Sequence, residues 1–257
     1  MGGKEYFERY TSQMAVIRKP GQRKLQKTHV HIGGLGGLGN LLAFFLNTAG
    51  VGYISANDPQ RLERENLGRF VCGEEADVGR HKVIAAARFF HRNRYTAFEP
   101  VVGKNESASV TPLYERADWI FSCANTVPAR LAAARMAINL SKPIIDVGVS
   151  DGRESLAGTI KYWLPECADW SACPACYLIP NTEIFQNEGL LFTVLAATSA
   201  LAAHVFVSLV TGFDAAFAKT QNYLAVDLGN GQFESLAVVK RKQCPACSNE
   251  WLRNHYM

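Results

Sequence analysis

The segment HVHIGGLGGLGN, residues 29–40, places five glycines within seven residues directly after a short apolar run. Glycines at this density permit a tight turn and let backbone amides approach phosphate oxygens, and a helix that begins after the loop adds positive potential. Gly34, Gly36 and Gly39 match the spacing G-x-G-x-x-G, with Gly37 inside it. The pattern predicts a strand, a nucleotide-binding loop and a helix. The alternative is a turn that only packs a helix against a sheet.

Asp58 stands at the end of the next apolar run, roughly 20 residues beyond the loop. In dinucleotide-binding folds an acidic residue at this place holds the ribose hydroxyls. Taken with the glycines alone, Asp58 favours a nicotinamide or flavin dehydrogenase.

Apolar runs alternate with helical patterns along most of the chain, which predicts an α/β fold with a mostly parallel, Rossmann-like sheet and helices on both faces. The expected strands are Val30–Gly33, Tyr53–Asp58, Phe98–Val102, Trp119–Cys123, Lys142–Val147 and Leu156–Leu164. The expected helices are Leu38–Ala49, Gly79–Asn93 and Thr126–Ser141. Near the C-terminus, Tyr223–Leu228 and Gln232–Val239 flank a Gly-Asn-Gly turn and predict an antiparallel hairpin.

Composition and charge restrict the classes of protein. The net charge of +4 is small for 257 residues and gives little support to nucleic acid binding. The polar amino terminus lacks the apolar core of a signal peptide, so a cytoplasmic setting is expected. Leu190–Val210 is long and apolar enough for a membrane span, but it carries several polar residues and has no basic flank. A buried helix is the preferred interpretation, and no membrane contact is expected.

Four of the seven cysteines form two C-P-A-C pairs, Cys173 with Cys176 and Cys244 with Cys247. Two such pairs supply the four thiolates of a closed, structural zinc site, and a reducing compartment keeps the thiols available. Unrelated buried thiols or a redox pair are the alternatives. Cys72, Cys123 and Cys167 lie outside this spacing, and Cys123 is expected in the core.

The residues after Asp58 change the interpretation of the glycine loop. ERENLGRF contains Asn66 and Arg69, and GRHK contains Lys82. In this order the motifs resemble the adenylyltransferase family that includes ThiF, MoeB and the catalytic halves of ubiquitin-activating enzymes. The resemblance runs from about residue 9 to the C-terminus. It implies one ThiF-like domain over residues 1–257, with an N-terminal arm (1–28), a nucleotide-binding core (29–150) and a substrate-binding part with the zinc site (151–257).

The resemblance also implies ATP and Mg²⁺ as cofactors and assigns roles to the motif residues. Asp58 would hold the ribose, Asn66 and Arg69 would engage the phosphates, and Lys82 would stabilise charge near the reacting phosphorus. These residue types suit carboxylate adenylation, which must neutralise a triphosphate and its pyrophosphate leaving group. Taken singly, Arg69 could instead be solvated on a loop, and Lys82 could lie on an exposed helix face.

Three positions depart from the family pattern. Asn125 replaces an aspartate that helps to bind magnesium, and an amide oxygen brings no charge to the metal. Ser12 replaces an arginine that reaches a partner subunit's ATP, and Arg9 and Arg18 are nearby candidates to substitute for it. The loop Tyr177–Gly189 contains no cysteine, which excludes a thioester at that position.

The preferred hypothesis is an ATP-dependent adenylyltransferase that activates the C-terminal carboxylate of a ubiquitin-like carrier protein or a peptide, as a homodimer. In that case Arg69, Lys82 and Asn125 would be its catalytic residues. A second hypothesis, motivated by Asn125 and Ser12, is a weakened member that binds a carrier tail or supports an active partner subunit. A nicotinamide-dependent dehydrogenase is a third.

Overall fold

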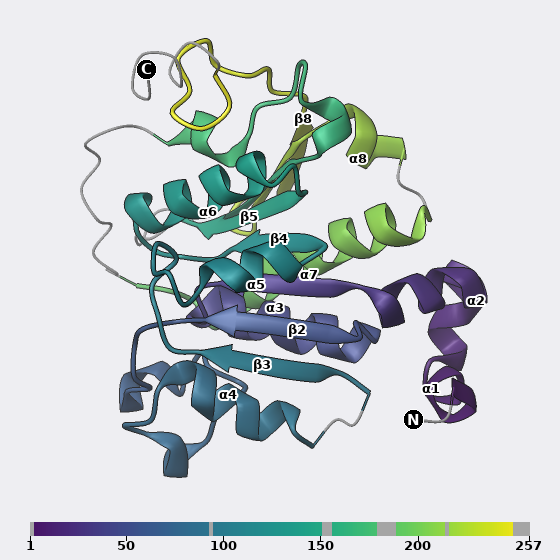
Figure 1. Ribbon diagram of the computed structural model, residues 1–257, viewed down its shortest axis with the longest axis vertical. Coiled ribbons are helices and arrows are strands. Elements are labelled where there is room, and N and C mark those ends of the chain that lie inside the picture. The colour runs from purple at the N-terminus through teal and green to yellow at the C-terminus, as the bar shows by residue number, and fades with distance from the viewer. Residues whose placement is uncertain (1–2, 93–94, 151–155, 179–188, 214–215, 249–257) are drawn as a thin grey trace.

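The computed structural model describes residues 3–92, 95–150, 156–178, 189–213 and 216–248, and all structural statements concern these residues. One sheet of eight strands runs through the molecule (Figure 1). Its strands are β1 (His29–Gly33), β2 (Tyr53–Asn57), β3 (Ala97–Val101), β4 (Trp119–Ser122), β5 (Ile144–Val149), β6 (Ala157–Trp163), β7 (Tyr223–Asp227) and β8 (Gln232–Leu236).

The strand order is β3-β2-β1-β4-β5-β6-β7-β8. The first five strands in this order, from β3 through β2, β1 and β4 to β5, are mutually parallel. Strands β6, β7 and β8 each pair antiparallel with the preceding strand. The predicted parallel sheet and C-terminal hairpin are both confirmed. The order reverses between β1 and β4, and ligands of open α/β sheets bind at such a point, beyond the carboxyl ends of the strands.

Helices cover both faces of the sheet, as predicted. They are α1 (Gly3–Arg9), α2 (Thr11–Lys27), α3 (Gly37–Ala49), α4 (Lys82–Phe90), α5 (Thr111–Arg116), α6 (Val127–Asn139), α7 (Phe192–Thr211) and α8 (Ala216–Thr220). Helices α3, α4 and α7 share one apolar core with the sheet, while α5 and α6 pack over the other face (Figure 1). The second core extends from α6 to the cysteine pairs.

The apolar helix α7 packs against α3, β5 and β6. Of the described helices, it is the one that is long and apolar enough to cross a membrane, yet half of its most apolar window is buried inside the fold. Its exposed residues are Phe192 at the first position and small or polar ones further along, Thr193, Ala200 and His204. The packing of α7 inside the fold agrees with its interpretation as a buried helix.

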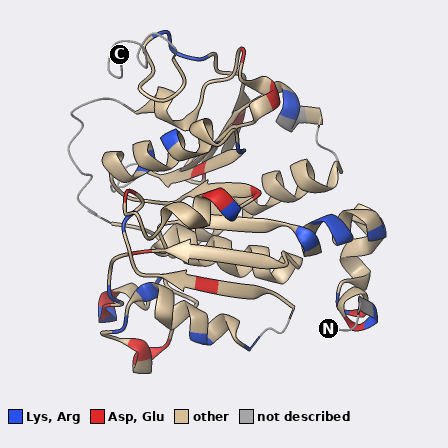
Figure 2. Ribbon diagram, viewed as in Figure 1, with Lys and Arg blue, Asp and Glu red and all other residues tan. Residues whose placement is uncertain are grey.

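The sequence predicted only an arm for the first 28 residues, whereas the structure shows two helices. The hydroxyl of Tyr6 donates to Gly50 O at 2.5 Å, and Gln13 Nε2 donates to Ala49 O at 2.8 Å. These contacts fix α1 and α2 at the C-terminal end of α3, opposite to the glycine loop (Figure 1). Lysines and arginines lie along α2, on the outer side of the molecule (Figure 2).

Two of the differences from the prediction have local reasons. Helix α4 begins at Lys82 rather than Gly79, because Gly79 has a φ of 89° and Arg61 forms a bridge with His81 just before the helix. Helix α5 was not predicted, since it has only six residues.

Candidate functional site

The glycine loop connects β1 to α3, and its glycines have separate physical roles. Gly34 has a φ of 97°, and a Cβ there would lie 3.0 Å from the backbone nitrogen of Ala124. A Cβ at Gly39 would lie 2.0 Å from the oxygen of Gly34, so only glycine lets the helix start so close to the strand. A Cβ at Gly36 would meet no atom within 4 Å. Gly36 therefore faces open space, as a backbone that receives a ligand requires.

Asp58 is buried beside the glycine loop at the carboxyl end of β2. Its Oδ2 accepts a hydrogen bond from the backbone amide of Leu35 at 2.8 Å, and its Oδ1 accepts one from the amide of Gln60 at 2.7 Å. The carboxylate thus fixes the loop and the segment after β2 in one arrangement.

Lys82 is buried at the start of α4, with 7% of its surface exposed. The alternative of an exposed helix face is therefore wrong. Its Nζ donates to Gln60 Oε1 at 2.7 Å. Burial lowers the pKa of Lys82, and the nearby Asp58 carboxylate opposes that shift. A desolvated ammonium near the Asp58 carboxylate is a strong partner for an incoming anion.

Arg69 lies across the beginning of α3. A Cβ at Gly37 would be 3.4 Å from Arg69 Cδ, so the arginine side chain runs beside the glycine loop. Its side chain is 26% exposed, and its Nη2 lies 3.8 Å from Glu65. Arg69 is thus a partly exposed side chain on a loop, and its place beside the glycines is compatible with the predicted phosphate contact.

The backbone around Arg69 is held by two asparagines. The side chain of Asn40 donates to Arg69 O at 2.9 Å and accepts from the amide of Val71 at 2.8 Å. Asn66 is buried, and its Oδ1 accepts from the amide of Glu63 at 3.2 Å in a capping box around a short 3₁₀-helix, Arg64–Asn66. The backbone oxygen of Asn66 also accepts from the amide of Arg69 at 2.9 Å, so Asn66 supports the arginine segment.

Two supporting residues, Asn40 and Gln60, were missed from the sequence. Asn40 is the polar position in the apolar run LGNLLAFF, and this isolated polarity was the available signal. Gln60 offered no such signal, because its role depends on how the segment after β2 folds back toward α4.

Asn125 is exposed in the loop between β4 and α6. Its neighbour Ala124 contacts the glycine loop at Gly34, so Asn125 lies at the carboxyl edge of the sheet beside the loop. The predicted nucleotide residues therefore gather around the ends of β1, β2 and β4, where the strand order reverses.

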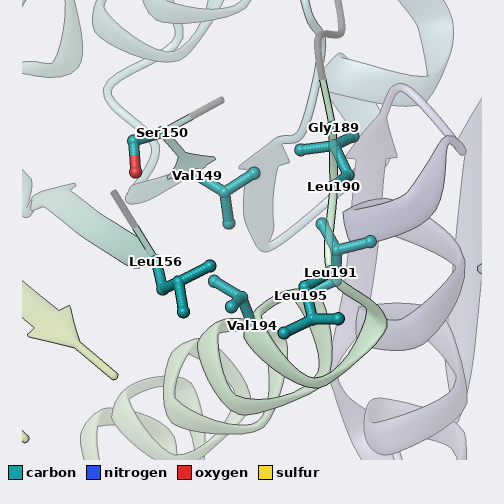
Figure 3. A pocket seen from close by; sticks show the side chains of 8 residues that line it. All are labelled: Val149, Ser150, Leu156, Gly189, Leu190, Leu191, Val194 and Leu195. Carbon is teal, nitrogen blue, oxygen red and sulfur yellow. The ribbon is translucent and has the colours of Figure 1, made fainter. Parts of the chain in front are cut away.

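A small apolar pocket lies at the same edge, between the end of β5, the start of β6 and the start of α7. The side chains of Val149, Leu156, Val194 and Leu195 converge on it (Figure 3). Leu195 also reaches the glycine loop, since a Cβ at Gly37 would lie 3.0 Å from its Cδ1. The pocket gives the site an apolar wall on the side of β5.

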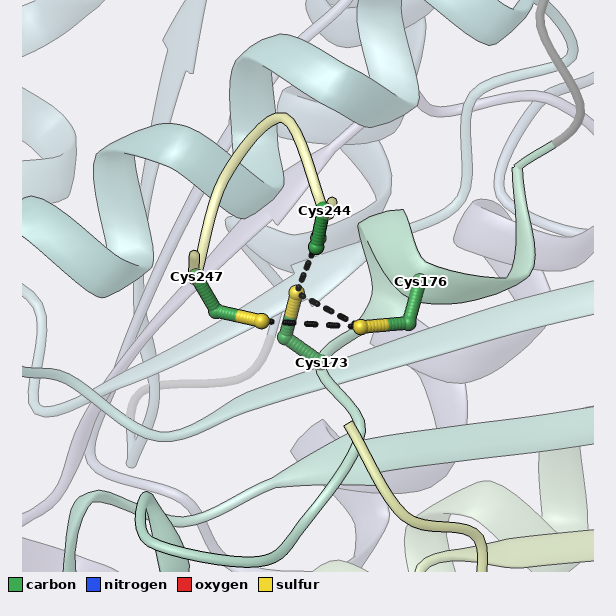
Figure 4. Close-up of side chains that lie close together, drawn as sticks. All are labelled: Cys173, Cys176, Cys244 and Cys247. Carbon is green, nitrogen blue, oxygen red and sulfur yellow. Dashed lines mark hydrogen bonds between the residues drawn. The ribbon is translucent and has the colours of Figure 1, made fainter. Parts of the chain in front are cut away.

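The four predicted metal ligands come together beside α6, as Figure 4 shows. The Sγ atom of Cys173 lies 3.6 Å from that of Cys244, and the Sγ atom of Cys176 lies 3.5 Å from that of Cys247. All four sulfurs fall within 4.8 Å of one another. Tetrahedral zinc with bonds of about 2.3 Å requires sulfurs about 3.8 Å apart, so the donor set fits this metal.

The cysteines outside the CPAC pairs do not join this cluster. Cys123 and Cys72 are buried, as expected for Cys123, and burial raises the pKa of both thiols. Cys167 is partly exposed, with its Sγ 4.0 Å from Lys219 O. The cysteine-free loop after the first pair lies almost wholly outside the described residues, so its lack of a thiol is known from the sequence alone.

The candidates to replace the missing arginine at Ser12 lie away from the glycine loop. The guanidinium of Arg9 lies 5.5 Å from the centre of the Tyr95 ring, and Arg18 interrupts α2 with a φ of 60°. Because α2 contacts the far end of α3, about 18 Å from the loop along the helix axis, neither arginine lies at this chain's own loop.

A family model described as the ThiF family matches residues 10–246. The chain belongs to the ThiF family. The heterocyst HesA protein of Trichormus variabilis is 27% identical over 251 residues, which cover 95% of this chain and 90% of that protein. The sulfur carrier protein ThiS adenylyltransferase of Escherichia coli is 25% identical over 248 residues, which cover 94% of this chain and 95% of the relative.

Solved structures share the ThiF-family fold. Escherichia coli MccB crystallised with MccA-N7isoAsn has a TM-score of 0.79 at 19% identity, covering 95% of this chain and 75% of MccB. MccB crystallised with ATP has a TM-score of 0.76 at 19% identity, covering 93% of this chain and 74% of MccB. At this identity the likeness establishes the fold, while family membership rests on the sequence match.

Proposed function

We propose that this ThiF-family chain uses ATP to adenylate the C-terminal carboxylate of a ubiquitin-like carrier protein or a peptide. The observation that carries the proposal is the linked set of Asp58, Gln60 and Lys82 beside the open backbone at Gly36. These groups are the buried ammonium of Lys82, the carboxylate proposed to hold the ribose, and a glycine loop that a ligand can reach. They lie together at one edge of the sheet. The family match favours ATP over a nicotinamide dinucleotide as the ligand.

The proposed chemistry assigns a task to each group. Asp58 holds the ribose while it also fixes the amide of Leu35. Lys82 and Arg69 neutralise the phosphates and the departing pyrophosphate, so that the substrate carboxylate can attack the α-phosphorus. Asn66 acts through the backbone that carries Arg69. Asn125 would contribute an amide oxygen to the magnesium that accompanies ATP, and that metal would supply charge neutralisation for the triphosphate.

The choice of substrate is supported by relatives. The Escherichia coli relative acts on the sulfur carrier protein ThiS, and MccB was crystallised with MccA. Both findings concern those proteins, and they support a protein or peptide tail as the substrate class of this chain. Helices α1 and α2 lie far from the chain's own loop, which fits a homodimer in which the N-terminal helices serve the partner's site.

We also propose that the four cysteines bind one structural zinc ion. All four positions would be thiolates, which leaves no open coordination site for catalysis. The crowded sulfurs favour ionisation of part of the set. The contact with Cys173 lowers the pKa of Cys176, and the expected cytoplasmic setting keeps the thiols reduced.

A second candidate function is a weakened member that binds a carrier tail or supports an active partner subunit. Asn125 and Ser12 favour it, because both replace charged residues of the family pattern with neutral ones. The adenylation fold and its nucleotide site would then serve recognition rather than turnover.

ATP–pyrophosphate exchange tests the adenylation proposal. The chain is incubated with ATP, Mg²⁺ and candidate carriers or peptides encoded by neighbouring genes. Exchange that depends on a carrier and is lost in Lys82→Met supports the proposal, with the exposed Lys219→Met as a matched control. ATP binding without exchange for a verified carrier would instead support the binding function. A fluorescence response to NADH without ATP binding would indicate a dehydrogenase.

A further inference from the structure

A polar cluster lies on the α6 face of the sheet, where β4, β5 and β6 are neighbours. Strand pairing brings Ser122, Asp146 and Lys161 side by side on this face. Asp146 is buried, and its Oδ1 accepts from Ser122 Oγ at 2.8 Å and from Arg130 Nη1 at 2.6 Å. Lys161 Nζ lies 3.9 Å from the other carboxylate oxygen of Asp146.

Among the described residues, the cluster has one carboxylate for two largely buried cations. The side chains of Arg130 and Lys161 are 17% and 19% exposed. Apart from the long contact with Asp146, the ammonium of Lys161 lies 5.5 Å from the centre of the Tyr177 ring. The Tyr177 hydroxyl is buried and has no hydrogen-bond partner among the described residues. The two cations exceed the one carboxylate by one positive charge, and the Tyr177 hydroxyl lacks a partner. Because these groups are largely shielded from water, their burial costs free energy unless an anion binds to them.

The carboxyl edge of the sheet lies beyond the next pair of residues on the same face of β5 and β6. Gly148 and Thr159 form that next pair, two residues beyond Asp146 and Lys161 on the same face. A Cβ at Gly148 would lie 3.2 Å from Thr159 Oγ1 and 3.5 Å from Arg130 Nη2. At that pair β5 and β6 carry only a glycine and a threonine, and the Arg130 guanidinium lies over the glycine. Asp146 is three residues from the end of β5 at Val149, a distance of about 10 Å.

The position of the cluster relative to the nucleotide residues points to the second reactant. The glycine loop, Asp58 and Lys82 occupy the β1–β2 side of the point where the strand order reverses. Strands β4, β5 and β6 form the other side, which leaves that half of the crevice for the molecule to be adenylated.

We propose that Arg130, Lys161 and the Tyr177 hydroxyl bind an acidic side chain in the C-terminal segment of the substrate. The inference rests on the proposed adenylation function and refines its substrate class. The terminal carboxylate reacts at the carboxyl edge of the sheet, the cluster lies about 10 Å inside that edge along β5, and an extended chain covers this depth in three residues. The substrate therefore carries an Asp or Glu within about four residues of its terminus.

Paired substrates test this preference. Synthetic peptides, and a ubiquitin-fold carrier whose last six residues are varied, carry either Glu or Gln at the second, third or fourth position from the terminus. ATP–pyrophosphate exchange with the wild-type chain should show kcat/KM at least about tenfold higher for Glu than for Gln in the best position, because a charge-assisted hydrogen bond is lost in the amide.

Variants of Lys161 connect the preference to the cluster. Lys161→Met should bring the Glu to Gln ratio close to one, Lys161→Arg should retain it, and Lys219→Met should leave it unchanged. Because Asp146 keeps Arg130 and Ser122, Lys161→Met should fold, and thermal unfolding checks this. Calorimetric binding of the Glu and Gln peptides to the ATP-bound chain should show the same preference without turnover.

The outcomes separate the inference from the function on which it rests. Equal rates for Glu and Gln substrates, or an unchanged ratio in Lys161→Met, overturn the acidic-tail inference and leave adenylation standing. Absence of exchange with every peptide and every carrier refutes the adenylation function, and the inference falls with it.

Discussion

The Oδ2 atom of Asp58 accepts a 2.8 Å hydrogen bond from the backbone amide of Leu35, so the proposed ribose ligand and the glycine loop are already joined without nucleotide. The connection continues through Gln60, whose amide donates to Asp58 and whose side chain accepts from Lys82. One carboxylate thus links the loop, the ribose position and the buried cation.

Replacing Asp58 should affect both binding and folding. Asp58→Ala should weaken ATP binding at least about tenfold and lower the free energy of unfolding by about 1–3 kcal/mol, because the Leu35 amide loses its acceptor. Asp58→Asn is the control, since it keeps one acceptor oxygen and should recover most of the stability but not the affinity. Calorimetry and urea unfolding measure the two effects. Wild-type ATP affinity in Asp58→Ala would contradict the ribose assignment.

Two glycines of the loop should respond differently to the same added methyl group. Gly36→Ala should leave the free energy of unfolding within about 0.5 kcal/mol, because a Cβ there meets nothing within 4 Å. It should still reduce ATP affinity at least about tenfold, since the methyl occupies the space of the phosphates. Gly34→Ala should destabilise by about 1–3 kcal/mol, given its φ of 97°. Normal ATP binding by a folded Gly36→Ala would rule out a phosphate loop here.

Features encoded within a short segment could be predicted from the sequence. The glycine spacing, Asp58 at the end of β2 and the two CPAC pairs are of this kind, and the structure brings each set together. The parallel sheet could also be predicted, because a chain in which apolar runs alternate with helices can adopt only a few topologies.

Features that depend on contacts between distant segments could not be predicted. Asp146 and Lys161 become neighbours only through the register of β5 with β6, which neither segment specifies by itself. The docking of α1 and α2 depends on Tyr6 and Gln13 reaching the end of α3, and their own sequence is polar and weakly patterned. Gln60 belongs to the same class, because only the folded segment brings it to Lys82.

Asn125 should limit the use of magnesium by the site. Asn125→Asp should raise ATP affinity at least about tenfold in the presence of Mg²⁺ and leave it unchanged in EDTA, because a carboxylate is a stronger ligand for a hard cation than an amide. Asn125→Ala controls for loss of the amide oxygen. A large gain in exchange rate would mark the natural site as weakened and favour the binding function. Equal affinity of wild type and Asn125→Asp with Mg²⁺ would show that this position does not serve the metal.

Zinc should be required for the C-terminal half of the fold. Cys244→Ser should reduce the bound zinc from about one ion per chain to below about 0.1 and lower the melting temperature, because a structural zinc site contributes folding free energy directly. Cys167→Ser is the matched control, since this thiol lies outside the cluster. Elemental analysis and thermal unfolding, with and without a chelator, measure the effects. Full zinc content in Cys244→Ser would contradict the four-cysteine assignment.

Acid should destabilise the fold through His31, which lies fully buried in β1. Its Nδ1 is 3.1 Å from Ser55 Oγ, while its Nε2 has no hydrogen-bond partner among the described residues. Burial lowers the pKa of His31 to about 3, well below the value near 6.5 that the unfolded chain retains. At a pH between these two pKa values, His31 binds a proton in the unfolded chain but not in the folded chain. Stability is therefore complete above about pH 6.5 and is lost as the pH falls toward 3.

The size of this loss can be isolated with a variant. From pH 7 to pH 5 the wild type should lose about 2 kcal/mol more unfolding free energy than His31→Gln, which has no proton to bind at this position. Urea unfolding at the two pH values measures the difference, and it does so even if the substitution lowers stability at both. His29 shares Ser55 through its Nε2 at 3.0 Å and remains present in both proteins, so its own titration contributes to both. Parallel pH dependence in the two proteins would show that His31 is protonated in the folded chain.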